Sequence, residues 1–198
     1  SYVAISEEIL GIIMQAADFN AGWAYRHLDA DEDWTAVTIP HDAMLYEPRH
    51  ALAASGLNSG WFEGRDYEYV KHFMPERDMA GSRMLLEFEG VYHHAEVWVN
   101  GEKAAFRPYG YTNFYVDLTD RVRFGEDNEI RVIARNADQP NSRWYSGAGI
   151  YRPVTLWTSP AEHIAVDGLF VRTIAADPAN GTARIRVEVE TTAAGSVH

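Results

Sequence analysis

Hydrophobic and polar residues alternate with a period of two over much of the chain after residue 82. Successive side chains of a β-strand point to opposite faces, so this pattern is typical of strands with one buried face and one solvated face. Three segments show it most clearly, at residues 84–90, 95–99 and 129–135. In the second of these, alanine and valine share one face, while Glu96 and Trp98 share the other. The pattern predicts an antiparallel, all-β fold.

Turn signals separate these segments. Asn100-Gly101 directly follows an alternating segment and is typical of a two-residue hairpin turn. Gly125 and the pair Asp127-Asn128 supply a turn before the third segment. A further strand is predicted at residues 154–157, after Pro153.

The first 80 residues are less regular, with several prolines and long stretches that follow neither a helical nor a strand period. Loops and short edge strands are predicted there. A helix over residues 6–17 is an alternative for the start of the chain, because Ser6, Glu7 and Glu8 would cap an apolar run. Gly11 disfavours this helix.

A domain boundary is predicted near Ser159-Pro160. Residues 163–175 and 183–192 then form two new strands around a turn at residues 177–181. Because two strands cannot close a sandwich, they are interpreted as the beginning of a second domain. The predicted division is a 1–17 extension, an 18–160 sandwich and a 161–198 start of a second domain.

Charge and composition narrow the classes of partner. The chain has 17 Lys and Arg against 29 Asp and Glu, a formal charge of -12 that repels nucleic acid and anionic membrane surfaces. It has no cysteine, which excludes disulfides and thiolate zinc sites and fits a reducing compartment such as the cytoplasm. The apolar run at residues 9–14 follows two glutamates and is far shorter than the roughly 20 residues of a membrane span, so neither a signal peptide nor a span is expected.

The histidines do not predict a metal site. His93 and His94 are adjacent, and neighbours on a strand point to opposite faces, so they are not expected to share a metal. The other histidines lack ligand spacing, and no cofactor is expected.

The carboxylates of the predicted strands do not identify a catalytic pair. A glycosidase needs two carboxyl groups across the scissile bond, and Glu87 and Glu89 share a strand face at a separation of about 7 Å. Alternating acids more often mark a solvated face, and this interpretation is preferred. Asn128-Glu129 and the glycosylation-like Asn180-Gly181-Thr182 are both interpreted as turns.

The most unusual segment is residues 139–153, which concentrate amide, guanidinium, indole and phenol groups between two strands. Such groups recognise sugars, because amides and guanidinium bond hydroxyls in fixed directions while rings cover C–H faces. The alternative is a stiff corner, in which Trp144 and Tyr151 pack inward and Arg152 pairs with an acid. Composition alone leaves both alternatives open.

The run NSRWYSGAGIYRPV at residues 141–154 resembles the hallmark of the N-terminal jelly-roll domain of glycoside hydrolase family 2, which includes β-galactosidases, β-glucuronidases and β-mannosidases. Four further motifs agree with the family in order. They are WTAVTIPHD at 34–42, GWFEGRDYEYVKHF at 60–73, FEGVYHHAEVWVNGE at 88–102 and YGYTNFYVDLT at 109–119.

The resemblance implies a galactose-binding-like β-sandwich, followed by the first strands of an immunoglobulin-like domain. It further implies a barrel beyond His198 that carries both catalytic glutamates of an exo-acting, retaining β-glycosidase. This chain would then hold no catalytic residue, and its partners would be a terminal β-linked sugar and the barrel of the same protein. The resemblance also allows a homo-oligomer of the full-length protein. The residues of the motifs resemble those of β-galactosidases most closely. However, no acidic residue occupies position 142 or 143, where some members of the family place a sugar-binding aspartate.

By the same resemblance, loops of this domain help to shape the subsite for the terminal sugar. The residues expected to contact the sugar are Asn141, Arg143, Trp144 and Asp138, followed by His41 and Asp42. For His41 and Asp42, a turn locked by side-chain hydrogen bonds is the preferred interpretation. The competing function for the whole chain is a freestanding carbohydrate-binding module or lectin, which an aromatic-rich jelly roll would also suit.

Overall fold

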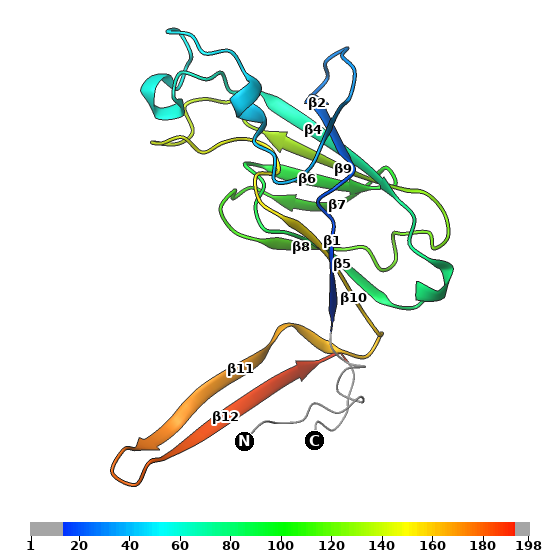
Figure 1. Cartoon of the computed structure of the whole chain (residues 1–198), viewed down its shortest axis with the longest axis vertical. Coiled ribbons are helices and arrows are strands. Elements are labelled where there is room, and N and C mark those ends of the chain that lie inside the picture. Colours follow the sequence, from blue (N-terminus) through cyan, green and yellow to red (C-terminus); the bar gives the residue numbers. More distant parts are fainter. Residues whose placement is uncertain (1–13, 193–198) are drawn as a thin grey trace. The chain divides into compact units, whose positions relative to one another are not determined.

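The computed structural model describes residues 14–192, and strands dominate it (Figure 1). The chain divides into two compact units. Among the described residues, the larger contains 16–80 and 84–157, and the smaller contains 14–15, 81–83 and 158–192.

The larger unit holds a six-stranded sheet with the order β3-β2-β4-β9-β6-β7, in which all neighbours are antiparallel. Its strands are β2 (Trp23–His27), β3 (Thr35–Val37), β4 (Asp66–Phe73), β6 (Ala95–Val99), β7 (Glu102–Arg107) and β9 (Asn128–Arg135). A second sheet has the order β1-β10-β5-β8. Its strands are β1 (Gln15–Asp18), β5 (Arg83–Phe88), β8 (Phe114–Asp117) and β10 (Val154–Ser159). Three 3-10 helices, η1 (Ala43–Tyr46), η2 (Gly56–Ser59) and η3 (Arg77–Met79), lie in the connections.

The core lies between the two sheets. Trp23 of β2 meets Phe88 of β5 edge to face, with ring centroids 6.4 Å apart, and both side chains are almost completely buried. Residues from both sheets join the same hydrophobic cluster. The predicted all-β sandwich is therefore confirmed, and the alternation in β6 matches its buried and half-buried positions.

The hairpin turn between β6 and β7 has the predicted geometry. Asn100 has φ 50° and Gly101 has φ 83°. Two consecutive positive φ values are those of the turn that Asn-Gly favours, because its twist matches that of the flanking strands.

The prediction of loops and short edge strands for the first 80 residues was wrong for β4. This eight-residue strand lies between β2 and β9 inside the six-stranded sheet. On its outer face, Glu68 is 1% exposed and accepts hydrogen bonds from Arg26 at 2.6 Å and Arg131 at 2.7 Å. A carboxylate can be buried in a central strand here because two guanidinium groups from neighbouring strands compensate its charge.

The alternative helix over residues 6–17 is contradicted where the structure describes it, because residues 15–17 belong to β1. Residues 6–13 of that segment lie outside the described residues. In the described part of the chain, no helix is long and apolar enough to cross a membrane.

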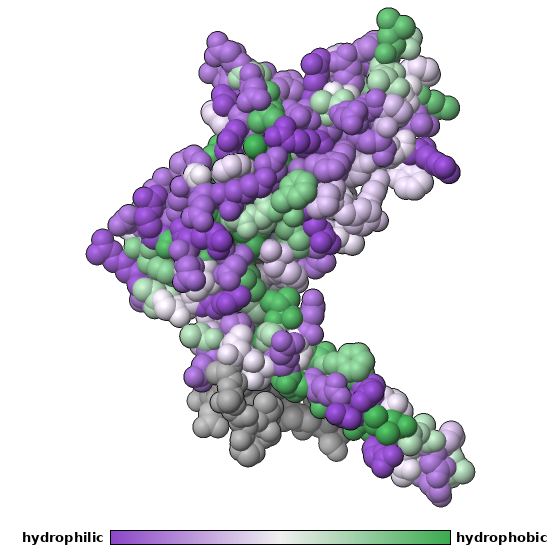
Figure 2. All heavy atoms as spheres, turned by 180° about the vertical axis from the view of Figure 1, so that it is seen from behind, coloured by the Kyte–Doolittle hydropathy of each residue, from purple (hydrophilic) through white to green (hydrophobic). Residues whose placement is uncertain are grey.

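The smaller unit contains the antiparallel hairpin of β11 (Ile164–Asp177) and β12 (Thr182–Thr191), which confirms the two strands predicted there. Hydrophobic residues are exposed along it (Figure 2). Leu169, Val171, Ile185 and Val187, which share one face by register, are all more than half exposed. A two-stranded ribbon is marginally stable alone, so this face suits further strands of a sandwich.

We expect Phe88→Ala to lower the free energy of unfolding by about 3–5 kcal/mol, because the buried ring leaves a cavity between the sheets. Phe106→Ala is the matched control, since Phe106 is 54% exposed on β7 and should change the stability by no more than about 0.5 kcal/mol. Urea unfolding of the chain measures both values. Equal effects of the two substitutions would contradict the described core.

Stability should also fall in alkaline solution. Burial raises the pKa of Tyr67 and Tyr69 above the usual tyrosine value of 10.0. As the pH rises above 10, these hydroxyls lose protons in the unfolded chain but keep them in the folded chain. The unfolded state then binds fewer protons, so the free energy of unfolding decreases with rising pH. Urea unfolding between about pH 8 and pH 11 measures the slope. Tyr67→Phe should make it shallower, and a slope unchanged by this substitution would refute the explanation.

Candidate functional site

The segment from residue 136 to 150, here called the recognition loop, connects β9 to β10 and is firmly attached at its C-terminal end. The amide of Ala43 donates to the carbonyl of Ala148 at 3.0 Å, and the amide of His41 donates to that of Ile150 at 2.8 Å. Gly149 exchanges two 2.9 Å backbone hydrogen bonds with Tyr92. Its φ of 87° favours glycine, and a Cβ there would lie 2.8 Å from the Cζ atom of Tyr69. Local sequence and close packing thus fix where the loop returns to the sandwich.

Asn141 is the anchor at the other side of the loop. Its Oδ1 atom accepts a hydrogen bond from the Tyr92 hydroxyl at 3.0 Å. Its Nδ2 atom donates to Oδ1 of the buried Asn136 and to the carbonyl of Asp138, both at 2.9 Å, and lies 3.1 Å from Nε2 of His93. Because these contacts occupy its amide, Asn141 serves to position the loop. Asp138 contacts Asn141 through its backbone carbonyl only and is itself exposed.

Arg143 and Trp144 are two adjacent exposed residues of the recognition loop. Trp144 is 61% exposed, and its indole Nε1 atom donates to the Tyr111 hydroxyl at 3.2 Å. The Ser142 hydroxyl bonds the backbone of Trp144 and fixes the turn that carries it. Arg143 is also exposed, and within residues 14–192 no hydrogen bond or ion pair of its guanidinium is found. The indole therefore lies outside the core, contrary to the stiff-corner alternative.

Asp42 connects the turn at residues 38–42 to the recognition loop. Its carboxylate accepts from the amides of Met44 at 3.1 Å and Ala148 at 2.9 Å, and from the Tyr145 hydroxyl at 2.6 Å. Burial and the nearby Asp42 carboxylate raise the pKa of Tyr145. A Cβ at Gly147 would lie 2.9 Å from this carboxylate, so the chain needs glycine there. Asp42 is thus held by the hydrogen bonds of a locked turn.

His41 lies deeper than Asp42 and is 7% exposed. Its Nδ1 atom is 2.9 Å from the Tyr69 hydroxyl, and its ring stacks on Tyr46 with centroids 5.3 Å apart. Burial lowers the pKa of His41 and favours the neutral imidazole. His41 and Asp42 therefore lie against the recognition loop, to which both are joined by hydrogen bonds within the fold.

The reasoning that placed His93 and His94 on opposite faces of a strand was wrong. His94 has φ 45°, outside the range of a strand, and the two ring centroids are 4.3 Å apart. Desolvation, with a smaller effect of His94, lowers the pKa of His93. Within the described residues, no group of three His, Asp or Glu side chains is arranged to hold a metal ion.

The acidic residues and turns that the sequence singled out make hydrogen bonds within the fold. Glu87 accepts hydrogen bonds from Asn113 and from the indole of Trp157, both at 2.8 Å. Asn128 is fully buried and closes the turn before β9 through hydrogen bonds to Arg123 and to other backbone groups. Asn180 caps the turn between β11 and β12 by donating to Asp177 at 2.7 Å.

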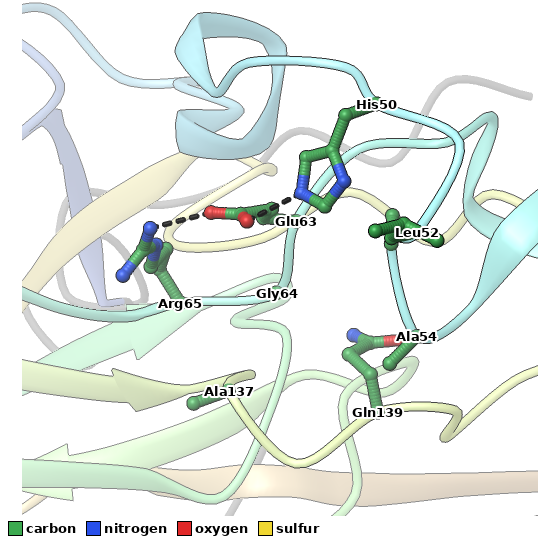
Figure 3. Close-up of a pocket in the computed structure, with 9 residues that line it drawn as sticks. His50, Leu52, Ala54, Glu63, Gly64, Arg65, Ala137 and Gln139 are labelled. Atoms are coloured by element: carbon green, nitrogen blue, oxygen red, sulfur yellow. Dashed lines mark hydrogen bonds and ion pairs between the residues drawn. The ribbon is translucent and has the colours of Figure 1, made fainter.

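An open cavity of about 300 Å³ lies beside the recognition loop and shares Gln139 with it (Figure 3). In the lining of the cavity, Nε2 of His50 lies 2.5 Å from Oε1 of Glu63, and Glu63 also forms an ion pair with Arg65. Both contacts lower the pKa of Glu63, the hydrogen bond from His50 most strongly. The charges that line the cavity are thus paired with one another. Sequence reasoning missed this cavity, and it also missed Tyr92 and Tyr111 as partners of the loop.

Comparisons with known proteins agree with this architecture. The family model described as "Glycosyl hydrolase 2 galactose-binding domain-like" matches residues 23–176. A β-galactosidase of Bacteroides ovatus, BoGH2A, is 38% identical over 172 residues, which are 82% of this chain and 20% of that protein. A β-glucuronidase of Bacteroides fragilis is 30% identical over 69% of this chain and 20% of its own length. The crystal structure of a β-glycosidase from Bacteroides vulgatus superposes with a TM-score of 0.80 and 29% identity, covering 89% of this chain and 24% of that one.

These matches share two features. The family match covers most of the chain, and the chain spans only about a fifth of the two curated relatives. The family resemblance seen in the motifs is confirmed, and the chain belongs to glycosyl hydrolase family 2, as the galactose-binding-like domain of its N-terminal part.

Proposed function

We propose that this domain is a non-catalytic, sugar-binding part of an exo-acting, retaining β-glycosidase, in which the recognition loop contacts the terminal sugar. The observation that carries the proposal is the exposure of the Arg143 and Trp144 side chains on an anchored loop. Arg143 has five N–H donors without a partner in the described chain, and Trp144 is 61% exposed. Donors fixed in direction beside an apolar ring are the groups that orient a sugar.

A neutral β-galactoside is the proposed substrate class. This assignment follows the 38% identity to the β-galactosidase of Bacteroides ovatus, which exceeds the 30% identity to the β-glucuronidase of Bacteroides fragilis. Arg143 would suit either sugar, since guanidinium bonds hydroxyls and carboxylates alike. The substrate screen below therefore distinguishes hydrolysis of a β-galactoside from hydrolysis of a β-glucuronide or a β-mannoside.

The state of the acids supports a non-catalytic role. A general acid for glycoside hydrolysis needs a carboxyl group whose pKa is raised. The four carboxyl groups for which a shift is resolved within the described chain, those of Glu32, Glu63, Glu96 and Asp177, all have a lowered pKa, chiefly because of hydrogen bonds. Such groups remain ionised and serve as acceptors. We assign the proton donor and nucleophile to the larger remainder that the curated relatives possess, because this chain spans only about a fifth of their length.

In the full-length protein, we expect Arg143→Ala and Trp144→Ala each to lower kcat/KM by about tenfold to hundredfold, because each removes a contact with the terminal sugar. Steady-state hydrolysis of the aryl glycoside that the protein cleaves best measures the effect. Arg172→Ala is the matched control, since Arg172 is a surface arginine of the β11–β12 hairpin and pairs with Glu188. Unchanged kinetics in folded Arg143 and Trp144 variants would assign the loop a structural role only.

The 198-residue chain alone should release no nitrophenol from aryl β-galactoside, β-glucuronide or β-mannoside, whereas the full-length protein should cleave at least one of them. Both proteins are assayed at equal molar concentration. Turnover by the isolated chain that disappears in Glu87→Gln would show that the active site lies in this sandwich. Micromolar binding of a monosaccharide by the isolated chain, measured by calorimetry, would instead favour the lectin alternative.

A further inference from the structure

Trp144 of the recognition loop and two neighbouring tyrosines, Tyr109 and Tyr111, form one partly exposed surface, here called the aromatic platform. Tyr109 is 55% exposed and Trp144 is 61% exposed. Tyr111 lies between them, since its hydroxyl accepts from the indole of Trp144 at 3.2 Å and its ring centroid is 5.5 Å from that of Tyr109. The platform therefore continues the apolar surface of the recognition loop onto the β7–β8 connection.

The platform rests on a rigid support. The Tyr151 hydroxyl donates to the carbonyl of Gly110 at 2.7 Å, and the rings of Tyr92 and Tyr111 meet with centroids 5.3 Å apart. A Cβ at Gly110 would lie 2.6 Å from Cδ2 of Tyr92, so this backbone packs directly on that ring. Because Tyr92 also bonds Asn141 at 3.0 Å, the same tyrosine supports both the platform and the recognition loop. Little ordering is then needed when a ligand binds.

The chemistry of the platform selects its ligand. None of its three side chains carries a charge, and each presents an apolar ring with a polar group at its edge. Exposed rings that do not pack into the core favour a ligand with apolar faces and peripheral hydroxyls. A neutral pyranose ring has this combination.

The geometry points to the aromatic platform as the binding surface for the second sugar ring of the substrate, with Tyr109 as its specificity-determining residue. This inference rests on the proposed function, because Trp144 at one end of the platform is assigned to the terminal sugar. The protein then acts preferentially on glycans in which a neutral ring follows the terminal sugar. Glycosides with a small alkyl group in that position leave Tyr109 without a contact.

The test compares two substrates of the full-length protein that share the terminal sugar: its methyl β-glycoside, and a disaccharide in which glucose is the second ring. Tyr109→Ala should lower kcat/KM about threefold to tenfold more for the disaccharide than for the methyl glycoside. Tyr109→Phe, which keeps the ring, should restore most of the difference. Phe106→Ala is the control, because Phe106 is an equally exposed aromatic residue of β7 outside the platform and should affect both substrates alike.

An equal effect of Tyr109→Ala on both substrates would overturn the inference while leaving the proposed function intact. If the full-length protein cleaves no glycoside, the proposed function fails, and saturation-transfer NMR with the same disaccharide tests the platform separately. Contacts to the glucose ring that are lost in Tyr109→Ala would then support the platform. Their absence from the unsubstituted protein would overturn it.

Discussion

The burial of Tyr69 joins the core to the candidate site. Its ring lies in the layer between the two sheets and is fully buried. Its hydroxyl lies 2.9 Å from Nδ1 of His41, and its Cζ atom leaves no room for a side chain at Gly149. One core residue thereby fixes both the turn at residues 38–42 and the end of the recognition loop. Any displacement of β4 within the sheet would move both segments.

The sequence predicted the second half of the sandwich well, because half-buried strands have an alternating pattern. Strand β4 was missed because its alternation is interrupted: Val70 falls on the face of Glu68, and Lys71 falls on the face of Tyr69. Burial of Glu68 depends on Arg26 and Arg131, which lie 42 and 63 residues away along the chain. No local pattern contains such a pairing, and only the assembled sheet brings the three side chains together.

The candidate site was predictable from its motif but not from its geometry. The motif placed Asn141, Arg143 and Trp144 together as candidate sugar contacts, and the structure shows that Arg143 and Trp144 are exposed. The motif did not distinguish them from Asn141, whose amide is occupied by contacts with Tyr92, Asn136 and Asp138. The bond between Asp42 and Tyr145 joins residues 103 positions apart, and only the fold reveals it. The proximity of His93 and His94 was missed for a related reason, since it depends on a local departure from strand conformation.

The arrangement of anchors along the recognition loop explains how it can be exposed and ordered at once. Asn141 is held on one side of the exposed pair, and Tyr145 is held by Asp42 on the other. Between these anchors the backbone is short, and the Ser142 hydroxyl bonds the backbone of Trp144, so its conformational entropy is largely lost on folding and not on binding. A sugar that meets Arg143 and Trp144 then has to order mainly their side chains. If the proposed function holds, the hydrogen bonds that occupy Asn141 and Asp42 contribute to recognition indirectly, because they keep the backbone that carries Arg143 and Trp144 in place.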